Sequence, residues 1–136
     1  MSASDEISKE AAIKELGRYF QLRIPGAPMF SDYIDDVWHD MMADREAYDE
    51  FARTNWGQLV EHHEFEEGDA VYAEIPWVKD YEQKFGKLPA VWFARSDGSI
   101  DTELQTEYQE TGKIENTPPR RSSLMTCLCR PDPHPI

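Results

Sequence analysis

The segment from residue 34 to residue 52 most constrains the fold, because its apolar residues recur at three- and four-residue spacing. On a helix these side chains fall within about 120° of arc, which is the width of a core-facing stripe. Ser31 or Asp32 can cap the start of such a helix, and Asn55 or Gly57 can adopt the left-handed conformation at its end. The sequence therefore predicts one helix that ends near residues 54–57. The stripe consists of Ile34, Val37, Trp38, Met41, Tyr48 and Ala52.

Two other segments also favour helices. Apolar residues at helical spacing predict a first helix over about residues 4–21, followed by a break at the proline- and glycine-containing IPGAPMF. A later pattern ends at a Phe-Gly pair near residue 86 and contains Pro76. It fits either a kinked helix from about residue 69 or a shorter helix that begins at Pro76. We expect the kinked form.

The predicted fold class is therefore mainly α, a small bundle of three to four helices. A short hairpin is possible near residues 90–104, since Asp97-Gly98 is a turn signal. From residue 111 the chain is polar and rich in proline, which is typical of an extended tail. We expect a helical domain over residues 1–110 and an extended tail over residues 111–136.

Length, net charge and the distribution of apolar residues exclude several classes of protein. A chain of 136 residues is sufficient for one hydrophobic core. Its net charge of −13 repels nucleic acid and anionic membranes. No apolar run approaches the roughly 20 residues that span a bilayer. The first ten residues carry acids where a signal peptide carries positive charge followed by an apolar stretch. We expect a cytoplasmic protein that binds neither a membrane nor nucleic acid directly.

Negative charge is concentrated between residues 54 and 78, where neither lysine nor arginine occurs. Such a segment attracts basic proteins and cations, although the same residues can serve only to keep the surface soluble. A basic protein partner is the interaction that this charge predicts. The candidate partner-binding residues are Glu61, Glu64, Glu66, Glu67, Asp69 and Glu74.

A second candidate site lies on the edge of the predicted helix at residues 34–52. Asp35 and His39 are four residues apart, so their side chains lie one helical turn apart on the same edge, in line with Glu46. If the chain doubles back after Gly57, one residue of the pair His62-His63 can join them. A carboxylate with imidazoles can bind a divalent metal such as zinc, manganese or iron. The alternative is an exposed histidine among abundant carboxylates.

The remaining chemistry is sparse. Cys127 and Cys129 stand in a CLC sequence, and thiols two residues apart are poorly placed to form a disulfide with each other. They can be reduced thiols, metal ligands or a link between two chains. The sequence contains no HExxH motif, paired CxxC, phosphate-binding glycine loop or GxSxG motif.

Several of these elements together resemble the glycine-rich-domain-containing-protein-like family. The shared order is an acidic residue, Trp-His, a tyrosine, an aromatic residue, a glycine and a terminal His-His, and later KFGKLPAVWF and CLC. Ala52 stands near the position where the family carries a cysteine, and the His pair falls about one residue late. The resemblance implies a helical architecture and no established reaction. The residues that carry the first part are Asp35, Trp38, His39, Tyr48, Phe51, Gly57, His62 and His63.

The sequence is compatible with two functions. The first is a small acidic protein that acts by protein-protein interaction and inhibits or neutralises a basic partner. The alternative is a metal-binding protein or metalloenzyme whose site is built on Asp35, His39 and His62 or His63. The absence of a catalytic motif favours a role other than an enzyme.

Overall fold

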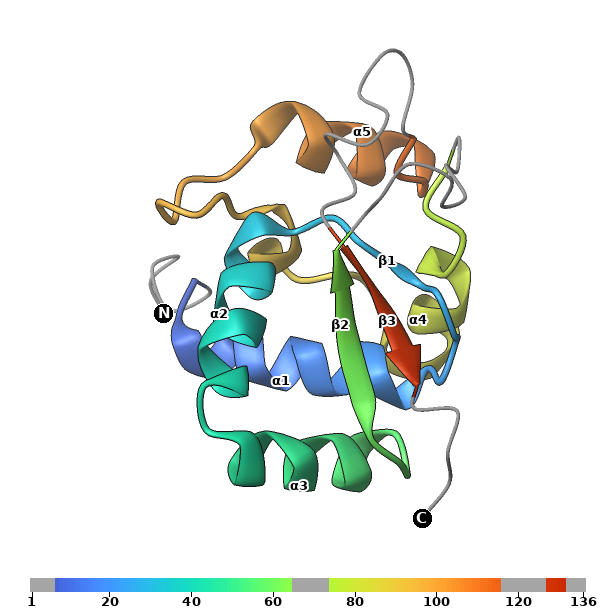
Figure 1. Cartoon of the computed structure of the whole chain (residues 1–136). Helices are drawn as coiled ribbons and strands as arrows, with labels where there is room; N and C mark the ends of the chain where they lie inside the picture. Colours follow the sequence, from blue (N-terminus) through green and yellow to red (C-terminus); the bar gives the residue numbers. More distant parts are fainter. Residues whose placement is uncertain (1–6, 65–73, 116–126, 132–136) are drawn as a thin grey trace.

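The computed structural model describes residues 7–64, 74–115 and 127–131, and the described part is mainly helical with a small sheet (Figure 1). The predicted helical class is confirmed, whereas the sheet was not expected. In chain order the elements are α1 (Lys9–Gln21), β1 (Pro28–Met29), α2 (Asp32–Met42), α3 (Arg45–Asn55), β2 (Val60–Glu64), α4 (Val78–Phe85), the 3-10 helix η2 (Ala90–Phe93), α5 (Thr102–Thr111) and β3 (Cys127–Pro131). None of the described helices is both long and apolar enough to cross a bilayer.

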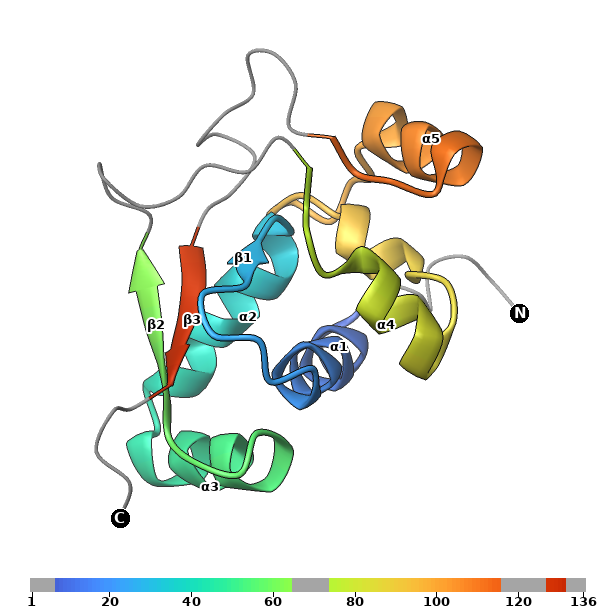
Figure 2. The same cartoon turned by 90° about the vertical axis from the view of Figure 1, so that its right-hand side faces the viewer.

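Helix α1 begins later than expected and ends where the sequence predicts. The Ser8 hydroxyl accepts a hydrogen bond from the Ala11 backbone N–H at 3.1 Å, which satisfies one of the unpaired donors of the first turn. The last helical residue is Gln21. Helix α1 contacts both α2 and α3, so it forms the centre of the helical layer (Figure 2).

The single helix predicted over residues 34–52 is in fact two helices. Asp44 separates them, because its carboxylate accepts from the Ala47 backbone N–H at 3.2 Å and caps a new helix. Most of the stripe nevertheless stays in the core, where Trp38 and Tyr48 are both fully buried, while Met41 is only partly buried. The Trp38 indole Nε1–H donates to the Tyr48 hydroxyl at 2.9 Å, and that hydroxyl donates to the Val60 carbonyl oxygen at 2.6 Å.

The sheet is formed by segments far apart in the sequence. Its order is β1-β3-β2 with antiparallel pairing, so β3 lies in the middle. The prediction of an extended tail over residues 111–136 is therefore wrong for Cys127–Pro131, which pairs with strands from the first half of the chain (Figure 1). It is also wrong at its start, since residue 111 still belongs to α5.

Two further predictions need correction. The kinked helix from residue 69 is not present over residues 74–77: α4 begins only at Val78, and the Ile75 backbone N–H donates to the Ile114 carbonyl oxygen at 2.9 Å. Pro76 accounts for this, because it biases the preceding residue towards extended backbone. The hairpin near residues 90–104 reduces to one isolated bridge, Ala94↔Ile100, after η2.

A buried carboxylate joins three of these elements. Glu15 of α1 is only 3% exposed. It accepts from the Trp92 indole Nε1–H at 3.0 Å, from the Arg18 guanidinium at 3.2 Å and from the Tyr81 hydroxyl. Because Tyr81 lies on α4 and Trp92 on η2, this carboxylate satisfies donors from both elements in the core.

Candidate metal centre

Helix α2 supplies the first two residues of the site. The Ser31 hydroxyl accepts from the Ile34 backbone N–H at 3.2 Å and fixes where the helix begins. Asp35 therefore lies in the first turn and His39 one turn later on the same edge. The imidazole Nδ1 of His39 lies 2.9 Å from the Asp35 backbone carbonyl oxygen, which restrains the orientation of the ring.

Strand β2 supplies the third residue, since the chain turns at Gly57 and returns beside α2 (Figures 1 and 2). Successive side chains of a strand point to opposite faces of the sheet. The His62 imidazole therefore faces α2, where its side chain is 4% exposed. The His63 imidazole faces the other way and accepts a hydrogen bond from Arg130 at 3.3 Å. Of the predicted pair, only His62 joins the site.

The distances between possible ligand atoms are short. Asp35 Oδ1 lies 2.8 Å from His62 Nε2 and 3.7 Å from His39 Nδ1. One ligand atom from each of the three residues lies within 4.8 Å of the other two. Tetrahedral zinc with bonds of 2.0–2.1 Å places its ligand atoms about 3.3 Å apart. The spacing of the three groups is therefore compatible with a shared ion after small movements of the side chains.

The surroundings hold two of the three groups firmly. The indole of Trp38 packs edge-on against the His62 imidazole, with ring centroids 4.6 Å apart. The Asp35 side chain is 14% exposed, and the His39 side chain is 46% exposed. Solvent thus reaches the site on the His39 side, while Asp35 and His62 belong to the packed interior.

The charge state of Asp35 suits cation binding. Burial alone raises the pKa of its carboxyl group, but hydrogen bonds from His62 and Cys127 and the nearby His39 outweigh burial and lower the pKa. A lowered pKa means that Asp35 is ionised at neutral pH. Its contacts therefore stabilise the fold above the ordinary aspartate pKa and are lost as the pH falls through the lowered value.

Other predicted residues lie away from this cluster. Glu46, expected in line with His39, is on the separate helix α3 because the chain breaks at Asp44. Glu61 and Glu64 are exposed on β2. The backbone of Glu74 pairs with that of Glu115 in an isolated antiparallel β-bridge. The remaining acidic candidates, Glu66, Glu67 and Asp69, lie outside the described residues.

One neighbour of the site was not predicted. The Cys127 thiol of β3 donates to Asp35 Oδ1 at 3.0 Å. The CLC sequence indicates that both thiols face the same way if the segment is a strand, because side chains two residues apart share one face. The extended tail that we expect over residues 111–136 does not place the face of Cys127 and Cys129 against α2.

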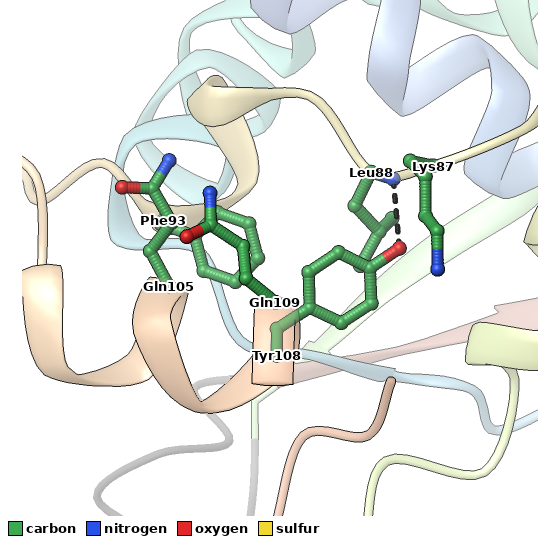
Figure 3. A pocket seen from close by; sticks show the side chains of 6 residues that line it. All are labelled: Lys87, Leu88, Phe93, Gln105, Tyr108 and Gln109. Carbon is green, nitrogen blue, oxygen red and sulfur yellow. Dashed lines mark hydrogen bonds between the residues drawn. The ribbon is translucent and has the colours of Figure 1, made fainter. Parts of the chain in front are cut away.

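A pocket of about 240 Å³ lies elsewhere, between α5 and the segment after α4, and contains none of the predicted site residues (Figure 3). The Tyr108 hydroxyl points to the Leu88 backbone N–H and accepts from it at 3.0 Å (Figure 3). The same hydroxyl donates to Glu82. The hydroxyl of Tyr108 therefore already has its hydrogen-bond partners within the structure.

Comparison of the chain with protein-family models, curated proteins and solved structures finds no match. The resemblance to the glycine-rich-domain-containing-protein-like family therefore stays a prediction.

Proposed function

We propose that the protein binds a single divalent transition-metal ion, such as zinc, through Asp35, His39 and His62. The observation that carries this proposal is the position of Asp35 Oδ1, 2.8 Å from His62 Nε2 and 3.7 Å from His39 Nδ1. Three residues from two elements thus bring a carboxylate and two imidazoles within 4.8 Å of one another. The two imidazoles also pack edge to face with ring centroids 4.2 Å apart, so both rings already lie beside the carboxylate.

The ligand set favours particular ions. Imidazole nitrogen suits zinc, copper, iron and nickel, whereas calcium and magnesium take oxygen ligands. Two imidazoles and one carboxylate are also the protein ligands of several catalytic zinc sites, in which water occupies the fourth position. The exposed side of the site, at His39, gives water access to that position.

Titration of the metal-stripped protein, purified without a histidine tag, tests this proposal. We expect one equivalent of zinc to bind, with no displacement by a large excess of calcium or magnesium, because nitrogen ligands discriminate against both. Elemental analysis of the untreated protein identifies the ion carried from the cell. A folded protein that retains no zinc at one equivalent would contradict the proposal.

The interaction function expected from the acidic segment stays a prediction. Only part of that segment lies within the described residues, and there the register of β2 and β3 places Arg130 opposite Glu61. A cation from the end of the chain thus accompanies the acids of β2. The described geometry favours the metal site over this alternative.

A further inference from the structure

Three elements converge on Asp35, and the third is the central strand β3. The Cys127 thiol is fully buried and donates to Asp35 Oδ1 at 3.0 Å. The same oxygen lies 2.8 Å from His62 Nε2. One carboxylate oxygen of α2 is therefore held by side chains from two adjacent strands, β2 and β3. Figure 2 shows the two strands side by side.

The neighbouring cysteine has a different environment. Cys129 follows by two residues and shares the same face of β3. Its thiol donates to the Ile24 carbonyl oxygen at 3.3 Å rather than to the site. Burial raises the pKa of the Cys129 thiol, so it remains protonated. The chain thus contains a second buried thiol that serves as a matched control for Cys127.

We propose, on the basis of the metal site argued above, that Cys127 is a positioning residue for Asp35 and not a ligand. Among the described residues, the group with mutually close ligand atoms contains Asp35, His39 and His62 but not Cys127. Carboxylates that bind metals are usually fixed by a hydrogen bond from a further residue. The Cys127 thiol supplies that bond from the interior, and it fixes the carboxylate beside the His62 ring.

This role has a measurable consequence for metal affinity. Cys127→Ala removes the donor, and we expect zinc affinity to fall about tenfold, as for other groups that orient a metal ligand. Cys127→Ser keeps a donor of similar size, so its affinity should stay within about threefold of the wild type. Cys129→Ala should also leave zinc affinity unchanged, since Cys129 contacts Ile24.

Two spectroscopic measurements separate this role from the alternatives. Cobalt(II) bound to the wild type should show no thiolate-to-cobalt charge-transfer band, because the Cys127 sulfur contacts Asp35 Oδ1 and does not bind the ion. In the metal-free protein, the infrared S–H stretch of Cys127 should lie below that of a thiol without a charged acceptor. Asp35→Asn should shift this band upward, because a neutral amide is a weaker acceptor than a carboxylate.

The outcomes are distinct. A thiolate band, equal zinc affinity of Cys127→Ala and the wild type, or a Cys127 stretch insensitive to Asp35→Asn would overturn the positioning role while the metal site stands. If the wild type binds neither zinc nor cobalt, the proposed function is wrong, and the positioning role of Cys127 is then wrong as well. The infrared result on the metal-free protein then reports only whether the bond between Cys127 and Asp35 exists.

Discussion

Replacement of His62 by alanine is expected to lower zinc affinity by at least about 100-fold. The substitution removes one of three protein ligands, which costs more than the 10- to 100-fold typical of losing a group that only orients a ligand. The two that remain, Asp35 and His39, both come from α2, so the site loses its link to β2. Competition titration with a chromophoric chelator measures the change.

His63→Ala is the matched control for this experiment. It removes the same side chain from the next residue of the same strand, but on the face where Arg130 contacts it. Its zinc affinity should remain close to that of the wild type. Because His62 is buried, Asp35→Asn provides a second variant that keeps the side-chain shape while removing the charged ligand. Equal losses for His62→Ala and His63→Ala would show that the ion binds elsewhere.

Replacement of Glu15 by alanine should destabilise the protein by about 3–5 kcal/mol. The variant leaves the Trp92 indole N–H and the Tyr81 hydroxyl without their acceptor in the core, and it removes the partner of Arg18. Removing a buried acceptor has this cost, because the buried donors of Trp92 and Tyr81 stay desolvated without a partner. Urea unfolding followed by tryptophan fluorescence gives the free energy of unfolding.

Two variants calibrate the Glu15 result. Glu15→Gln keeps the shape and one acceptor oxygen, so its loss should be smaller than that of Glu15→Ala. Glu50→Ala removes an exposed glutamate from α3 and should change the free energy of unfolding by no more than about 0.5 kcal/mol. If Glu15→Ala were no more destabilising than Glu50→Ala, the buried network would contribute nothing to stability.

The sequence predicts the helical stripe well, because burial follows the apolar spacing directly. Trp38 and Tyr48 are in the core as expected, even though the helix between them breaks. The break itself was missed, since an aspartate at position 44 is compatible with both a helix interior and a cap. Only the tertiary contacts decide between them.

The convergence at the site follows from the sequence in part. The four-residue spacing of Asp35 and His39 fixes their shared edge, and the turn at Gly57 permits the return of the chain. The choice between His62 and His63 depends on the register of β2 against β3, which is a contact between distant segments. The same pairing brings Cys127 to Asp35, and no local pattern specifies it.

Anomalous diffraction at the zinc absorption edge, from crystals grown with one equivalent of zinc, shows directly whether Asp35, His39 and His62 bind the ion. The proposed site predicts one peak about 2.0–2.2 Å from a ring nitrogen of His39, a ring nitrogen of His62 and a carboxylate oxygen of Asp35. A fully occupied zinc bound instead at His63, or a well-ordered Asp35 with no peak beside it, would contradict the claim.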